Sequence, residues 1–160
     1  MLAASGQLNR RLGGPSFRPF RVQIFNSHFY ELFDSPDPEF NRRTIYRINV
    51  NSAKSPLLDA LDCPDPSVKA PRRNVTTTPL QALGLMNNSF VWRQARKLAE
   101  RVQREAGDAP GARISRACQL TLGRKPTAAE LGLLQPLAER HGLENVCWVL
   151  LNANEFVYLR

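Results

Sequence analysis

The stretch Thr78-Pro79-Leu80-Gln81 divides the sequence into two parts of different character. It has the form of a capping box with proline at the first helical position. In such a box the threonine hydroxyl and the glutamine side chain each satisfy a backbone amide at the start of a helix. Nine of the twelve prolines lie at or before Pro79. The sequence therefore predicts an irregular, proline-rich part over residues 1–78 and a helical part over residues 79–160.

The helical part carries apolar residues at helical spacing. Val91, Ala95, Leu98 and Val102 follow at steps of four, three and four, which places them on one face of a helix. The same spacing and a second capping box predict further helices, which begin near Pro110, at Thr127-Ala128-Ala129-Glu130 and at Leu143. The predicted fold is mainly α, with a C-terminal bundle of four to five helices.

One or two short strands and one helix are predicted in the proline-rich part. β-branched and aromatic residues favour strands at Val22–Phe25 and Thr44–Val50, although the second segment also fits a helix. A helix is predicted over Ala3–Leu12, where Gly13-Gly14-Pro15 would end it. This helix would begin at residue 3 with no partner before it. We therefore interpret residues 1–160 as a single domain or as the C-terminal fragment of a larger protein.

The distribution of charge argues against a dedicated nucleic-acid reader. The 160 residues carry 22 basic and 14 acidic side chains, a formal net charge of +8, and 18 of the basic residues are arginine. Residues 1–78 and residues 79–160 each hold eleven basic and seven acidic side chains, so no basic stripe is concentrated in either half. Non-specific nucleic-acid binding therefore ranks third among the functions considered, and charge is its only support.

Other patterns limit the chemistry of the chain. The three cysteines, Cys63, Cys118 and Cys147, form no C-x-x-C pair, so they encode neither a disulfide framework nor a zinc cage, and the c-type haem motif is absent. No cofactor is predicted in this chain.

The sequence also contains no pattern typical of an enzyme. With two histidines and no nucleophile motif, no catalytic residue is predicted, which favours a function other than catalysis. The sequence shows no apolar run of roughly 18 residues and no signal peptide.

An apolar-Asp-x-Pro-Asp-Pro-x-apolar motif occurs twice, at residues 33–40 and 61–68, and a pair of arginines follows each copy. Two carboxylates on a stiff turn can bind a hard cation such as Ca²⁺, and paired arginines can bind an anion. The structural alternative is that Asp before Pro forms a turn and pairs with a nearby arginine. The candidate metal ligands are Asp34, Asp37, Asp62 and Asp65. The candidate residues for an anionic or carbohydrate ligand are Arg42, Arg43, Arg72, Arg73, Asp62 and Asp65.

Aromatic residues gather next to the first predicted strand. Phe25, Phe29, Tyr30 and Phe33 are interleaved with polar residues. Such residues can form a stacking platform for bases or sugars, but more often they simply pack inside the fold.

Several motifs resemble a known family. The most specific are Thr78-Pro79-Leu80-Gln81-Ala82-Leu83 and Leu150-Leu151-Asn152-Ala153-Asn154-Glu155-Phe156. They resemble the C-terminal domain of unknown function in large exported planctomycete proteins, many of which also carry a cytochrome-c-like domain near the N-terminus. The matching pieces run from residue 13 to the C-terminus. The resemblance implies no catalytic residues, because the family has no established activity, and it implies that an export signal and any haem belong to an upstream part.

The leading hypothesis is a non-catalytic interaction or scaffolding module at the C-terminal end of an exported multidomain protein. Its expected partner is an upstream domain of the same protein or another protein, bound through the surface of residues 13–75. The resemblance implies an exported or periplasmic location, which the chain itself does not encode. The alternative is a domain that binds or processes an anionic ligand or a carbohydrate at the arginines and Asp-Pro loops.

Overall fold

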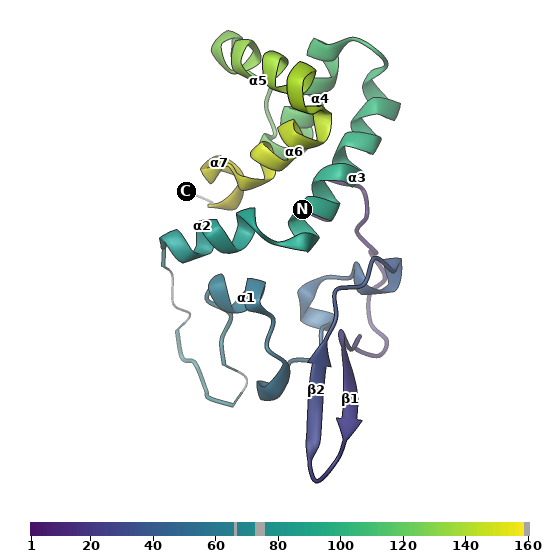
Figure 1. The fold of residues 1–160 in the computed structure, drawn as a ribbon, viewed down its shortest axis with the longest axis vertical. Coiled ribbons are helices and arrows are strands. Elements are labelled where there is room, and N and C mark those ends of the chain that lie inside the picture. The colour runs from purple at the N-terminus through teal and green to yellow at the C-terminus, as the bar shows by residue number, and fades with distance from the viewer. Residues whose placement is uncertain (66, 73–75, 159–160) are drawn as a thin grey trace. The chain divides into compact units, whose positions relative to one another are not determined.

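The computed structural model describes residues 1–65, 67–72 and 76–158, and Figure 1 shows its helices and strands. The chain forms two compact units. One unit consists of Met1–Leu8 together with Ser89–Arg160, and the other consists of Asn9–Asn88.

The first unit is helical, which confirms the mainly α prediction. Its helices are α3 (Ser89–Ala106), α4 (Pro110–Leu122), α5 (Ala128–His141), α6 (Leu143–Asn152) and the single turn α7 (Asn154–Val157). The longest of them, α3, packs against α4 and α6. The four residues predicted to share one face of it, Val91, Ala95, Leu98 and Val102, are each 0% exposed. Helices α4 and α6 contribute the rest of this core, including Ile114, Ala117, Cys118, Val146, Cys147 and Leu151.

The buried cysteines pack as small apolar side chains. Cys118 and Cys147 are both free thiols in the core. Burial raises the pKa of Cys147 to about 12 and also raises the pKa of Cys118. Both thiols therefore stay protonated near neutral pH, and neither presents a thiolate nucleophile.

Both predicted capping boxes are present. The Thr78 hydroxyl accepts from the amide of Gln81, and the Thr127 hydroxyl accepts from the amide of Glu130 at 3.2 Å. In return, each side chain at the third position accepts from the amide of its threonine. Two helix starts in this chain are thus determined by four-residue patterns that can be read directly from the sequence.

The prediction of a helix over Ala3–Leu12 is wrong. The expectation that this segment has no packing partner within the chain is also wrong. Residues 2–6 form turns, because Gly6 has a left-handed φ of +75° that ends the helical path after one turn. The partner of this segment is α3. The Ser5 hydroxyl donates to Oε1 of the buried Gln94 at 2.7 Å, and Arg101 donates to the carbonyls of Ala3 and Ala4.

The second unit contains one hairpin and short helices. Its strands are β1 (Phe20–Ile24) and β2 (His28–Leu32), which form a two-stranded antiparallel sheet. Its α-helices are α1 (Pro56–Ala60) and α2 (Pro79–Met86), which pack against each other. Single 3₁₀ turns occur at Pro38–Phe40, Thr44–Tyr46 and Asn51–Ala53.

The strand predicted at Val22–Phe25 is confirmed in its main part, but the one at Thr44–Val50 is wrong. That segment begins with a 3₁₀ turn and then forms an isolated bridge between Phe17 and Arg47. Its alternating pattern does not produce a strand, because Tyr46, the first residue of that pattern, lies within the 3₁₀ turn, and the one sheet among the described residues contains only β1 and β2. The true partner of β1 is β2, which the sequence pattern missed because apolar residues are adjacent in it rather than alternating.

One ion cluster leads to a prediction on acid stability. Arg124 donates to Glu130 of α5 and to Glu155 of α7, both at 2.7 Å. The Arg124 guanidinium, followed by the amide of Thr127, lowers the pKa of Glu130 from 4.5 to about 2. A carboxyl whose pKa is lower in the folded state stabilises the fold above its unfolded pKa, and the contribution disappears as the pH falls through the folded value.

We therefore expect the stability of the helical unit to decline between about pH 4.5 and pH 2, and Glu130→Gln to flatten this decline. The variant should also be less stable than the parent at pH 7. Thermal unfolding followed by circular dichroism from pH 2 to pH 7 measures both effects. The matched control is Glu139→Gln in the same helix, whose curve should follow that of the parent. Parallel curves for parent and Glu130→Gln would contradict the assignment.

Candidate functional site

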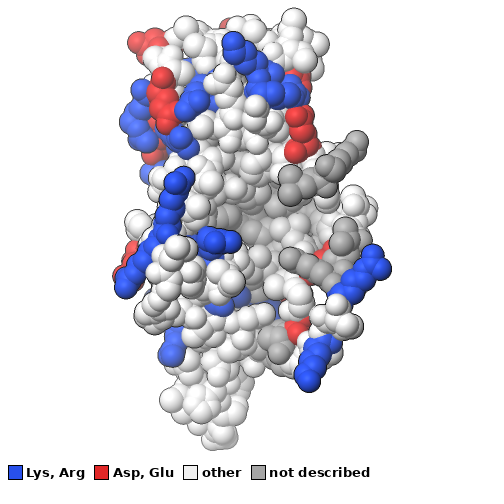
Figure 2. All heavy atoms as spheres, turned by 180° about the vertical axis from the view of Figure 1, so that it is seen from behind, with Lys and Arg blue, Asp and Glu red and all other residues white. Residues whose placement is uncertain are grey.

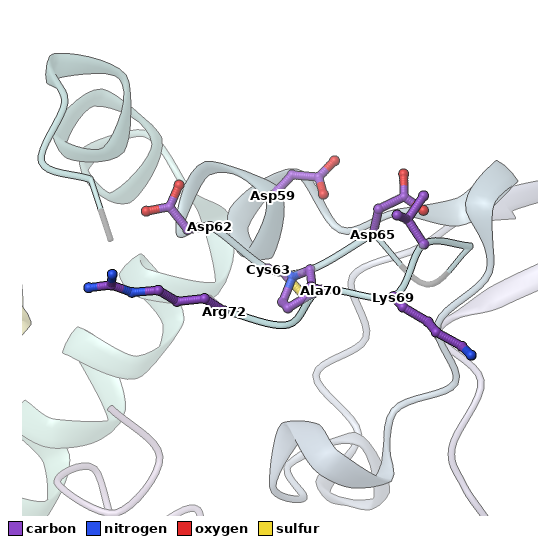
Figure 3. A pocket seen from close by; sticks show the side chains of 9 residues that line it. Asp59, Asp62, Cys63, Asp65, Lys69, Ala70 and Arg72 are labelled. Atoms are coloured by element: carbon purple, nitrogen blue, oxygen red, sulfur yellow. The ribbon is translucent and has the colours of Figure 1, made fainter. Parts of the chain in front are cut away.

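The second unit contains a pocket of about 380 Å³ beside the loop that follows α1 (Figure 3). Three of the candidate residues, Asp62, Asp65 and Arg72, line it together. The remaining lining residues are Asp59, Cys63, Pro64, Val68, Lys69 and Ala70. Arg73, another candidate ligand residue, lies outside the described residues.

Asp62 connects the end of α1 to the start of α2. Its Oδ2 accepts from the amide and the hydroxyl of Thr76, both at 2.8 Å, and from Nε2 of Gln81 at 3.3 Å. Gln81 is buried and is also the glutamine of the first capping box. Asp62 itself has a left-handed φ of +58°. This carboxylate therefore supports the local fold at one wall of the pocket.

Asp65 is likewise engaged by neighbouring side chains. Lys54 donates to it at 2.7 Å, and both the amide and the hydroxyl of Ser67 donate to its other oxygen. The hydrogen bond from Lys54, followed by those from Ser67, lowers the pKa of Asp65 well below its usual range. The carboxylate is therefore ionised and neutralised by a lysine within the same unit.

The two basic side chains of the pocket do not converge. Figure 3 shows Arg72 and Lys69 pointing away from each other on opposite sides of Cys63. A clamp on one small anion needs cationic groups directed at the same point. The pocket thus brings candidate residues together without giving them the geometry of an anion clamp.

The two Asp-Pro loops form the same turn. In the first loop the Asp37 carboxylate accepts from the amide of Glu39 at 2.9 Å, and its carbonyl accepts from the amide of Phe40. In the second loop the Asp65 carboxylate accepts from the amide of Ser67 at 2.8 Å, and its carbonyl accepts from the amide of Val68. The repeated motif therefore encodes a repeated local turn, which is the structural reading of Asp before Pro.

The first loop and its arginine pair do not line the pocket: the lining residues include none of Asp34, Asp37, Arg42 and Arg43. Across residues 1–65, 67–72 and 76–158, no three His, Cys, Asp or Glu side chains are grouped as a metal ion would require.

Arg42 holds a loop in place. Its guanidinium donates to the carbonyl of Gly13 at 2.6 Å and to that of Pro15 at 2.7 Å, and it lies 4.0 Å from the centre of the Tyr46 ring. The neighbouring Arg43 is exposed and makes none of these contacts. The twin arginines therefore differ, since one is committed to the fold and the other faces solvent.

The hairpin presents a second candidate surface, which lies within the expected docking surface of residues 13–75. The register pairs Phe20 with Leu32, Val22 with Tyr30 and Ile24 with His28, so these six side chains share one face of the sheet. We call this the apolar face. The opposite face is polar near its base, where Arg21 lies opposite Glu31.

The apolar face is covered only at its base. Phe20 is 8% exposed and packs edge-to-face on Tyr30, whereas Val22 is 45% exposed and Ile24 is 71% exposed. At the tip, Phe25 is 72% exposed and contacts Phe29. In Figure 2 the tip of the hairpin is the lower end of the view, and no charged residue is visible there. Exposure therefore rises along the hairpin, and its outer half leaves apolar side chains in solvent.

The four aromatic residues considered as a stacking platform do not form one. Phe25 and Phe29 contact each other at the tip, Tyr30 packs against Phe20 on the apolar face, and Phe33 packs on Phe40. The apolar face could be predicted only if the pairing of β1 with β2 were known, because the register determines which residues share a face.

The remaining findings concern the whole chain. Among its described residues, no helix is long and apolar enough to cross a membrane. Comparison with curated proteins and with solved structures finds no match. A family model, PSD1, described as a protein of unknown function (DUF1553), matches residues 1–138, which is most of the chain. The chain therefore belongs to the PSD1 (DUF1553) family of proteins of unknown function.

Proposed function

We propose that this chain is a non-catalytic interaction module in the C-terminal part of an exported multidomain protein. Its binding surface is the apolar face of the β1–β2 hairpin, and its partner is a preceding domain of the same polypeptide. The observation that carries the proposal is the exposure of Val22 and Ile24 on a sheet face that the second unit covers only at Phe20. The motif resemblance described above supports the multidomain context.

An uncovered apolar face is costly for a two-stranded sheet. Isolated hairpins are marginally stable in water, and sheets normally bury one face against another layer. Burying a valine or isoleucine side chain contributes about 1.5–3 kcal/mol. Covering the outer half of the hairpin would therefore stabilise both the hairpin and the complex.

The pocket beside α1 gives weaker support to the alternative function, which is the binding of an anionic ligand or a carbohydrate. Asp62 and Asp65 already have partners within the unit, and Lys69 and Arg72 point apart. A small anionic ligand there would have to reorient at least one of the two basic side chains. The interaction surface needs no such change.

Site-specific photo-crosslinking in the full-length protein tests the proposal. A benzophenone amino acid replaces Ile24 or Leu32, two exposed residues of the apolar face, and the control position is Leu133 of α5, which is 76% exposed and so is at least as accessible as Ile24. We expect crosslinks from the hairpin positions to a segment of the polypeptide outside residues 1–160, identified by peptide mapping. The yield at Leu133 should be at least about tenfold lower.

Two results would overturn this assignment. One is an equal crosslinking yield at the hairpin and at Leu133, which would mean that accessibility alone determines the reaction. The other is reaction of the hairpin positions with residues 1–160 alone, which would place its partner inside the domain or in a second copy of it.

A further inference from the structure

One edge of β1 pairs with β2, and its other edge can pair with a further strand. Two hydrogen bonds set the phase of the hairpin ladder: the amide of Phe33 donates to the carbonyl of Pro19, and the amide of Phe25 donates to that of Ser27. In an antiparallel pair, hydrogen-bonded and non-hydrogen-bonded pairs alternate. Arg21 and Gln23 therefore direct their backbone groups toward β2, and Phe20, Val22 and Ile24 direct theirs away from it.

We propose that the β1 strands of two copies of the chain pair antiparallel about Val22, which joins two hairpins into one four-stranded sheet. The twofold axis at Val22 places Phe20 opposite Ile24 of the second copy and Val22 opposite its own counterpart. The three residues with outward backbone groups then all form hydrogen-bonded pairs. Six amide-to-carbonyl bonds result, and no strand residue needs to change its conformation.

The side chains of β1 fit this register. The strand reads apolar-polar-apolar-polar-apolar and is symmetric about Val22, so apolar residues meet apolar residues across the new junction. On the polar face Arg21 meets the neutral Gln23 of the second copy, whose side chain donates to its own Glu31 at 2.9 Å. No like charges lie opposite each other, and each Arg21 is flanked by Glu31 on its own hairpin and Gln23 on the other.

The edge of β2 fits a second copy less well. Pairing about Tyr30 would place His28 opposite Leu32 and Phe29 opposite Glu31, so polar residues would face apolar ones in both pairs. β1 also has no lysine and no proline within the strand, which are two of the residues that protect natural sheet edges. The second copy is therefore assigned to β1.

This pairing goes beyond the proposed function, because it uses the edge of β1 and not the apolar face. A four-stranded sheet would place two apolar faces side by side and leave both open to their partners. The two proposals can fail separately, since one concerns association of the chain with itself and the other concerns contact with a different domain.

Sedimentation equilibrium of the chain over a range of concentrations tests the pairing. We expect a reversible dimer, and Val22→Pro should raise its dissociation constant by about thirtyfold or more, because two amide hydrogen bonds are lost across the twofold axis. The matched control is Tyr30→Pro, which removes an outward amide from the β2 edge and should change the constant by less than about threefold. Val22 and Tyr30 form a non-hydrogen-bonded pair in the hairpin, so neither substitution removes a backbone hydrogen bond between β1 and β2.

A second variant keeps the test valid if proline disturbs the hairpin. Residues in a hydrogen-bonded antiparallel pair have Cα atoms about 5.5 Å apart, which suits a disulfide. In a Cys63→Ser background, Val22→Cys should therefore form a disulfide-linked dimer under mild oxidation, and Arg21→Cys should form far less of it. A monomer at all concentrations, equal effects of the two proline variants, or equal crosslinking of the two cysteine variants would each overturn the proposal.

Discussion

Replacing Leu98 by alanine is expected to lower the free energy of unfolding of the helical unit by about 3–4 kcal/mol. Leu98 is 0% exposed on α3, the helix that packs against both α4 and α6. The substitution removes buried apolar surface and leaves a cavity in a core that is already close-packed. Because a small unit has only about 5–15 kcal/mol of stability, a loss of this size is a large fraction of the total.

Hydrogen exchange of the amides of α3 and α6, combined with urea unfolding, measures this loss. The matched control is Leu133→Ala in α5, where the leucine is 76% exposed and the expected change is within about 0.5 kcal/mol. Equal effects at the two positions would show that the core of this unit is not where the structure places it.

Arg42→Ala is expected to destabilise the second unit by about 2–3 kcal/mol, and Arg43→Ala by less than about 0.5 kcal/mol. Arg42 donates two short hydrogen bonds to the carbonyls of Gly13 and Pro15 and stacks on Tyr46, whereas exposed Arg43 makes none of these contacts. Its loss would remove these contacts and release the loop of Gly13 and Pro15 that they hold. Arg42→Lys should restore only part of the stability, because lysine lacks the planar fork that reaches both carbonyls.

Hydrogen exchange of residues 9–50 measures this effect directly. The expected result is faster exchange of the amides of Phe17 and Tyr46 in Arg42→Ala and unchanged exchange in Arg43→Ala. The opposite order would make Arg43 the structural residue and leave Arg42 available for a ligand.

The second copy of the Asp-Pro motif shows why a sequence repeat can suggest chemistry that the structure explains differently. Both copies close the same turn through Asp37 and Asp65, and the second carboxylate is also neutralised by Lys54. The turn could be predicted, because a side chain bonding to the amide two residues later is local. Lys54 could not be assigned as the partner, because nothing in the motif specifies which distant cation will reach it.

The hairpin shows the opposite failure. β1 could be predicted from its β-branched and aromatic residues, but β2 does not alternate and was missed. Without β2 the register was unknown, and without the register no apolar face could be assigned. Thr44–Val50 does alternate, so its pattern predicts a strand. The prediction is wrong because alternation does not show whether a segment has a neighbouring strand, and this segment has none in the described structure.

Features that arise from interactions within about four residues can be read from the sequence. These are the starts of α2 and α5, the buried face of α3, and the turns at the two Asp-Pro loops. Three other features become visible only in the folded chain: Met1–Leu8 packs on α3, Arg42 donates to carbonyls of a distant loop, and one face of the hairpin is left uncovered. The physical reason is that capping and helical periodicity depend on spacing along the chain, whereas these contacts join residues that are about 30 to 100 positions apart or depend on how two strands align.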